Sequence, residues 1–100
     1  SEFSTWFDAL ESMKKQISEI DFDIALIGCG AYGMPLAAHV KLIGKQAIHL
    51  AGWTQVLFGI KGQRWVEIQD VRKYMNKYWE SPLQTEKPVN FIKVENGCYW

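Results

Sequence analysis

The sequence predicts an α/β fold with a small parallel sheet and flanking helices, in a partial Rossmann-like arrangement. Two apolar runs, at 22–28 and 46–50, have the length of strands, and a helix-forming segment at 33–43 lies between them. Strand, helix and strand together span about 30 residues, the length that a right-handed crossover between parallel strands requires. The first run also lacks alternation of polar and apolar residues, which predicts a strand covered on both faces of the sheet.

A first helix is predicted over residues 5–20. Thr5 and Asp8 have the spacing of a capping box, in which a hydroxyl and a carboxylate satisfy free amides of the first helical turn. Apolar residues then recur at steps of four and three, as expected of a helix with one buried face. They are Trp6, Leu10, Met13, Ile17 and Ile20.

The helix at 33–43 has signals at both ends. Pro35 suits a first helical turn, because the N–H that proline lacks would have no partner there. Gly44 is a natural C-terminal stop. The inward face of this helix is predicted to consist of Leu36, Ala37, Val40 and Ile43.

The C-terminal half has weaker signals. Further helices are predicted at 54–61 and 70–80, because Thr54 and Asp70 are favourable N-cap residues. The apolar face of the later helix would hold Val71, Tyr74, Met75 and Tyr78. A third strand is predicted at 91–94.

The chain is interpreted as a single α/β domain over residues 1–100, since its length leaves no room for a second. Residues 81–100 are predicted to form a loose C-terminal tail, although the apolar ending at 97–100 favours docking of the last residues against a groove or a partner. Residues 1–3 are interpreted as a remnant of cloning and carry no weight.

Composition limits the partners. Eleven Lys and Arg against eleven Asp and Glu give zero formal charge, so no overall basic field attracts nucleic acid, and we expect no such partner. No run approaches the roughly 18 apolar residues of a membrane span. Two cysteines, Cys29 and Cys98, without a signal peptide fit a reducing cytoplasm better than a disulfide scaffold.

The aromatic content predicts self-association. Aromatic residues make up 14% of the chain, which is more ring surface than so small an interior readily covers. A sheet of two or three strands is also narrow, and a parallel sheet needs helices on both faces. We therefore expect a homo-oligomer, most simply a homodimer, or a unit that leans on a portion of protein outside this sequence.

A glycine motif lies between the first predicted strand and the next helix. Gly28, Gly30 and Gly33 form a full G-x-G-x-x-G, in which small residues let backbone amides approach a phosphate at a helix N-terminus. The acidic residue expected about 20 positions later in a dinucleotide site is absent, because 49–53 reads His-Leu-Ala-Gly-Trp. Two interpretations stay open: a ligand site for an anion, and a bare tight turn.

A second group of candidate ligand-binding residues follows the second predicted strand. Lys61 and Arg64 should lie at the same sheet edge as the glycine turn, where ligands of parallel sheets bind. With His49, which is also the better placed of the two histidines for acid–base work, they would converge on one phosphate. The alternative is a solvated loop with Trp65 in the core.

Other signals are interpreted as structural. Asp21 and Asp23 match a D-x-D pattern that binds metal in some enzymes, but they precede the strand, at the wrong end for that role. Cys29 lies near a helix N-terminus without a base partner in the sequence. We therefore assign no catalytic residue and no metal ligand, and the cofactor is unknown.

Four segments carry a resemblance to known proteins. Asp23–Gly33, Gly44–Leu50, Gln55–Trp65 and Gly97–Trp100 resemble a group of largely uncharacterised bacterial proteins, and the match runs from about Trp6 to the end. Those proteins are similar to the C-terminal, Rossmann-like part of glycosyltransferases of the GT-D fold type.

That resemblance implies a binding edge for a nucleotide or nucleotide sugar at the glycine turn, Lys61 and Arg64. The catalytic acidic motif of such enzymes lies upstream, in a portion for which this chain has no counterpart. The expectation is therefore a module without activity of its own, and glycosyltransferase-like activity if it is an enzyme. The alternative is a non-catalytic structural or oligomerisation module with no small-molecule ligand.

Overall fold

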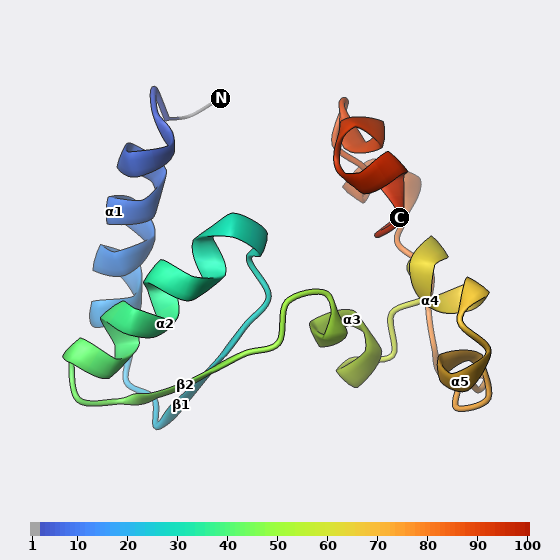
Figure 1. Cartoon of the computed structure of the whole chain (residues 1–100), viewed down its shortest axis with the longest axis horizontal. Coiled ribbons are helices and arrows are strands. Elements are labelled where there is room, and N and C mark those ends of the chain that lie inside the picture. The colour runs from blue at the N-terminus through green and yellow to red at the C-terminus, as the bar shows by residue number, and fades with distance from the viewer. Residues whose placement is uncertain (1–2) are drawn as a thin grey trace. The chain divides into compact units, whose positions relative to one another are not determined.

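A computed structural model describes residues 3–100, and the chain divides into two compact units (Figure 1). The first ends at Ala51 and the second begins at Gly52. The single folded domain expected from the sequence stays a prediction. The expected cloning remnant falls largely on Ser1 and Glu2, which lie outside the described residues.

The first helix, α1, spans Trp6–Ser18 and begins with the predicted capping box. The amide of Asp8 donates to Thr5 Oγ1 across 3.1 Å, and the amide of Thr5 donates to Asp8 Oδ2 across 3.0 Å. Leu10 is buried, as expected. The helix ends two residues before Ile20, which is exposed, so the predicted bounds 5–20 were too wide.

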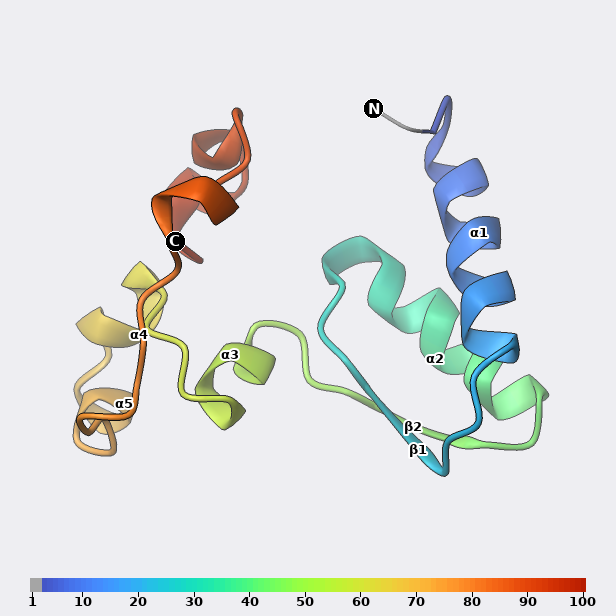
Figure 2. The same cartoon turned by 180° about the vertical axis from the view of Figure 1, so that it is seen from behind.

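The predicted strand–helix–strand unit is confirmed. Strands β1 (Ile24–Ile27) and β2 (Gln46–His49) pair in parallel, and helix α2 (Gly33–Leu42) connects them. Ile24 lies opposite Gln46 and Ile27 opposite His49. Figures 1 and 2 show both helices on the same side of this two-stranded sheet, with α1 packed on α2.

The two faces of the sheet differ in burial. Ala25, Ile27 and Ala47 point to the helices and join the core, which is built around Leu10, Ile27, Leu36 and Val40. On the opposite face, the side chains of Ile24, Leu26 and Ile48 are each about half exposed. Within the first unit, the expectation of a strand covered on both faces is therefore wrong, because both helices pack on one face only.

The second unit contains three short helices: α3 (Trp53–Leu57), α4 (Gln63–Glu67) and α5 (Gln69–Arg72). The predicted helix 54–61 was too long, because Gly59 adopts the left-handed φ of +68° just beyond α3. Helix α4 was not predicted at all.

The predicted helix 70–80 was also too long. Only part of its predicted apolar face is buried, since Val71 is buried while Tyr74 and Tyr78 are exposed. Without a buried face to stabilise it, a helix does not extend, and α5 ends at Arg72.

The predicted strand at 91–94 is wrong. Phe91–Lys93 forms a short 3-10 helix, η3, which follows η2 (Gln84–Glu86) and precedes η4 (Glu95–Gly97). The ring of Phe91 packs so closely on Gly97 that a Cβ there would lie 2.7 Å from it. This contact folds the segment on itself and leaves no extended strand.

The end of the chain is tied to α3 and α4. The amide of Arg64 donates to the carbonyl oxygen of Cys98 across 2.8 Å, and the side-chain amide of Gln55 donates to the carbonyl oxygen of Tyr99 across 2.8 Å. The tail was predicted to be loose, but its last residues are held by these hydrogen bonds. This agrees with the docking that the apolar ending favoured.

Candidate functional site

The glycine turn leaves β1 and enters α2 through a 3-10 helix, η1, at Gly30–Tyr32. Gly28, Cys29, Gly30 and Ala31 are exposed. Gly30 has a φ of +50°, a conformation that glycine adopts without steric cost. The strand therefore turns sharply into the helix and leaves the backbone of the turn open to solvent.

The amides of this turn are available to a ligand. Tyr32 donates to the carbonyl oxygen of Cys29 and Gly33 to that of Gly30, which closes the 3-10 turn. Within the described part of the chain, no backbone acceptor takes a hydrogen bond from the amides of residues 28–31. They precede a helix of ten residues, whose N-terminus carries partial positive charge.

His49 borders the same turn from the end of β2. Its Nδ1 lies 3.3 Å from the carbonyl oxygen of Ile27. Its ring packs against Gly33 so tightly that a Cβ on Gly33 would collide with it. The structure therefore brings the predicted residues Gly33 and His49 together, and the third glycine of the motif makes room for the imidazole.

An aromatic pair that the sequence did not indicate anchors the turn. The ring of Tyr32 stacks on that of Trp6 in α1, with ring centroids 4.9 Å apart and an interplanar angle of 8°. Tyr32 also packs against the core. The exposed glycines thus sit between two fixed points, the end of β1 and the Tyr32 stack.

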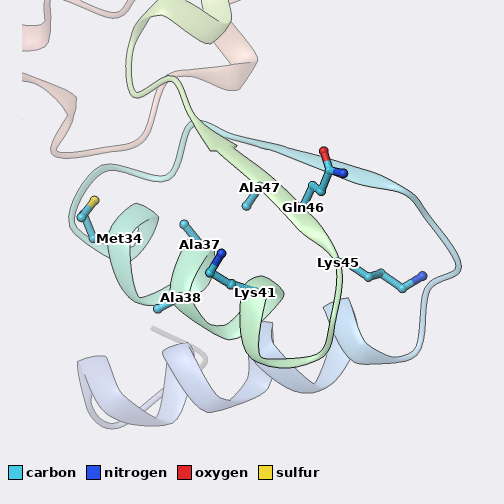
Figure 3. Close-up of a pocket in the computed structure, with 7 residues that line it drawn as sticks. All are labelled: Met34, Ala37, Ala38, Lys41, Lys45, Gln46 and Ala47. Atoms are coloured by element: carbon cyan, nitrogen blue, oxygen red, sulfur yellow. The ribbon is translucent and has the colours of Figure 1, made fainter.

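A separate hollow of about 500 Å³ lies between α2 and β2 (Figure 3). Lys45 points away from α2 in this view, and its Nζ donates to Asp21 Oδ1 across 3.1 Å and to the carbonyl oxygen of Phe22 across 2.6 Å. Asp21 of the D-x-D pattern is thus paired with a lysine at the surface. The hollow is lined by Met34, Ala37, Ala38, Lys41, Lys45, Gln46 and Ala47, which offer few converging polar groups.

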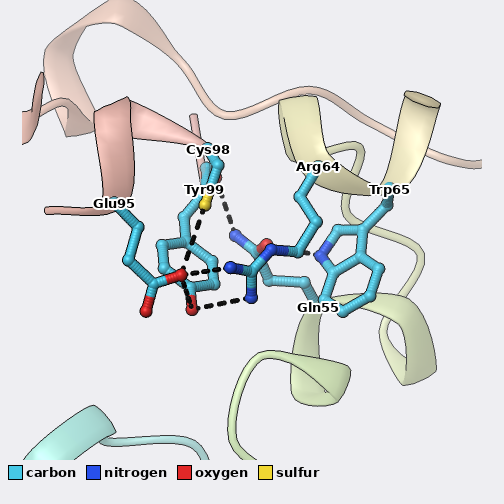
Figure 4. Close-up of polar contacts among 6 residues, drawn as sticks. All are labelled: Gln55, Arg64, Trp65, Glu95, Cys98 and Tyr99. Atoms are coloured by element: carbon cyan, nitrogen blue, oxygen red, sulfur yellow. Dashed lines mark hydrogen bonds and ion pairs between the residues drawn. The ribbon is translucent and has the colours of Figure 1, made fainter. Parts of the chain in front are cut away.

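In the second unit, Arg64 belongs to a polar cluster (Figure 4). Its guanidinium forms an ion pair with Glu95, and its Nη1 donates to the hydroxyl of Tyr99 across 3.0 Å. Burial acts to lower the pKa of Arg64, but Tyr99, Cys98 and Glu95 outweigh it and raise that pKa above its ordinary value. Arg64 is therefore a permanent cation whose Nη1 contacts Tyr99 and whose Nη2 contacts Glu95.

Trp65 lies in the core of the second unit, as the alternative interpretation of this segment proposed. Its Nε1 donates to Gln55 Oε1 across 2.8 Å, while Gln55 donates to the Tyr99 carbonyl oxygen. Lys61 is half-buried, and its amide donates to the carbonyl oxygen of Glu80 across 2.7 Å.

The six predicted ligand-binding residues are divided between the units. Gly28, Gly30, Gly33 and His49 lie in the first, and Lys61 and Arg64 in the second. The convergence of all six on one phosphate stays a prediction. The sequence missed Glu95 and Tyr99 as partners of Arg64, although the apolar ending of the chain indicated a docked segment.

Among the described residues 3–100, no group of three or more His, Cys, Asp and Glu side chains is arranged to hold a metal ion. None of their helices combines the length and the apolar character that crossing a membrane requires. Comparisons with protein-family models, curated proteins and solved structures found no match to this chain. Its function must therefore be inferred from its own residues.

Proposed function

We propose that this chain is a Rossmann-like binding module whose glycine turn holds a phosphate of a nucleotide or nucleotide sugar. The observation that carries the proposal is the exposed turn at 28–31, whose amides have no backbone acceptor and precede the ten-residue helix α2. Backbone amides without an acceptor near the positive end of a helix dipole commonly bind anions.

His49 supports the same proposal. When Nδ1 donates its proton to the carbonyl oxygen of Ile27, Nε2 is the ring nitrogen left for a ligand. A protonated ring would then donate from Nε2 to a phosphate oxygen. The close contact with Gly33 places the ring at the turn.

The proposal is binding without catalysis. We assign no catalytic residue in this sequence. Lys61 and Arg64 remain candidate contacts, but Arg64 is engaged by Glu95 and Tyr99. The glycine turn and His49 are therefore the part of the site on which the proposal rests.

A thermal-shift panel of UDP-, GDP- and dTDP-sugars, NAD and S-adenosylmethionine tests it. A ligand that binds the folded state raises the melting temperature by mass action. We expect a shift with at least one nucleotide sugar, and we expect Ala31→Asp to abolish it, because the added carboxylate repels a phosphate at the exposed turn. The matched control is Ala38→Asp, at an exposed position of α2, which should retain the shift. A wild-type chain that responds to none of these compounds would contradict the proposal.

A second candidate function, an oligomerisation module, is favoured by the half-exposed apolar face of Ile24, Leu26 and Ile48. Parallel sheets normally have both faces covered, and a second copy would supply the cover. Sedimentation should then give a dimer that Leu26→Lys converts to monomer. Leu42→Lys, at a leucine that is 85% exposed, should leave it intact. A wild-type chain that sediments as a monomer excludes this candidate.

A further inference from the structure

Three donors converge on one carboxylate oxygen in the second unit. The oxygen is Oε2 of Glu95, which forms the ion pair with Arg64. The hydroxyl of Tyr99 donates to the same atom across 3.3 Å, and the thiol of Cys98 lies 3.8 Å from it. A guanidinium and a hydroxyl aimed at one oxygen are the groups that proteins use to hold an oxyanion.

The backbone that carries Glu95 is strained. Glu95 and Asn96 have φ values of +46° and +56°, in the left-handed region that L residues adopt at a steric cost. Gly97 follows at +73°, where glycine pays no such cost. The contacts of the Glu95 carboxylate with Arg64 and Tyr99 contribute to holding this segment in that conformation.

Contacts other than those with Glu95 also hold the donors. The guanidinium carbon of Arg64 lies 4.9 Å from the centre of the Tyr99 ring and 5.8 Å from that of Trp65, and these rings limit its movement. The main chain of Tyr99 is tied separately to Gln55. The side chains of Arg64 and Glu95 are 36% and 55% exposed, so small ions in solution reach the pair.

We propose that Arg64, Tyr99 and Cys98 form a site for a phosphate-like tetrahedral oxyanion, which Glu95 occupies in the free chain and which a ligand gains by displacing Glu95. Arginine presents parallel N–H groups that match two oxygens of a phosphate, and the hydroxyl supplies a third donor. The site lies wholly within the second unit and needs nothing from the glycine turn, so it stands even if the proposed nucleotide site fails.

The test is a titration with inorganic phosphate, followed by the NMR signals of the arginine Nε–H groups. The chain has two arginines, so Arg72 is a built-in reference for Arg64. We expect phosphate to shift the Arg64 signal of wild type only at high concentration. Glu95→Gln, which removes the competing charge, should lower the midpoint about tenfold, the factor expected for one charged hydrogen bond.

The matched control is Glu67→Gln, which removes one negative charge from the same unit at an exposed position that contacts Gln63. It should lower the midpoint far less than Glu95→Gln does, because the ion pair of Arg64 is with Glu95 and not with Glu67. Equal midpoints in Glu95→Gln and wild type, or equal shifts of the Arg64 and Arg72 signals, would overturn the proposal.

Glu95→Asp serves if Glu95→Gln does not fold. It keeps the charge but withdraws the carboxylate by one methylene, so the midpoint should still fall below that of wild type. In the Glu95→Gln background, where the competing charge is absent, Tyr99→Phe keeps the ring, removes one donor and should raise the midpoint. A double variant that binds phosphate as well as Glu95→Gln would exclude the hydroxyl from the site and overturn its proposed composition.

Discussion

The two units of this chain are stabilised in different ways. The first has regular elements, a parallel strand pair and a contiguous apolar core around Leu36 and Val40. The second has helices of four or five residues, and its buried large apolar side chains are Trp65 and Val71. The first unit therefore depends mainly on apolar burial. Its free-energy contribution is proportional to the buried area and depends little on exact atom positions.

The second unit depends instead on particular atoms. Gln55 links Trp65 to the main chain at Tyr99 through two hydrogen bonds. Gly62 allows this close approach, since a Cβ there would lie 2.6 Å from Gln55 Oε1 and 3.0 Å from the Tyr99 carbonyl oxygen. Hydrogen bonds and close contacts are directional, so single polar substitutions should matter more here than in the first unit.

The largest expected effect tests the apolar core of the first unit. Leu36→Ala removes a side chain that is almost fully buried, and such changes cost about 2 to 5 kcal/mol of unfolding free energy. Leu42→Ala, the same change at an exposed position of α2, is the control and should cost far less. Urea unfolding followed by circular dichroism measures both. Equal losses would mean that the assigned core does not stabilise the unit.

Gly33→Ala tests a place where the first unit depends on atomic detail. The new methyl group would collide with the His49 ring, and overpacking of this kind costs about 1 to 3 kcal/mol. In a His49→Ala background the same change should be neutral or stabilising, because alanine is the better helix former and Gly33 already has a helical φ of −58°. A double-mutant cycle of melting curves measures the coupling, and additive effects would contradict the contact.

Gln55→Met tests the polar link of the second unit. The change leaves the Trp65 N–H without its partner, and we expect a loss of about 1 kcal/mol because the site is only half-buried. Gln69→Met, at an exposed glutamine of α5, is the control and should have little effect. Tryptophan fluorescence during unfolding follows both. If the two variants lose equally, the second unit is stabilised by apolar contacts in the same way as the first.

The smallest effect concerns Tyr99. Burial raises its pKa above the ordinary value of tyrosine, Glu95 raises it further and Arg64 opposes the shift. Because the folded state holds this proton more tightly, its stabilising effect is full below the ordinary tyrosine pKa and is lost as pH rises through the raised one. Absorbance titration should show a phase at high pH that Tyr99→Phe removes. If the substitution removes a phase in the ordinary tyrosine range instead, the raised pKa of Tyr99 is wrong.

The first unit could be predicted from the sequence because its signals are local. Thr5 and Asp8 are three residues apart, and the glycine turn and its two strands lie within about 30 consecutive residues, so pattern and spacing were sufficient. The candidate turn at Gly28, Gly30 and Gly33 was found for the same reason. The exposed face of the sheet was not predicted, because an apolar run does not indicate which face of a strand a helix will cover.

The second unit was predicted poorly because its contacts are distant in sequence. The amide of Arg64, at the start of α4, bonds to Cys98, and Phe91 folds back on Gly97 instead of continuing as a strand. Glu95 is separated from Arg64 by 31 positions and lies in the segment predicted to be a loose tail, so nothing in the sequence indicated that the two residues pair. Propensity is a weak prior that such tertiary contacts override.

The amino-acid order alone thus determined the capped first helix, the parallel crossover and the position of the glycine turn, since each of these follows from backbone preference and spacing over a few turns of chain. Only the folded structure decided which donors and acceptors find a hydrogen-bond partner. Among the described residues, the amides of 28–31 have no backbone acceptor, whereas the Arg64 guanidinium contacts Glu95 and Tyr99. The physical reason is that a hydrogen bond depends on the distance between two atoms, and only folding sets that distance for residues far apart in the chain.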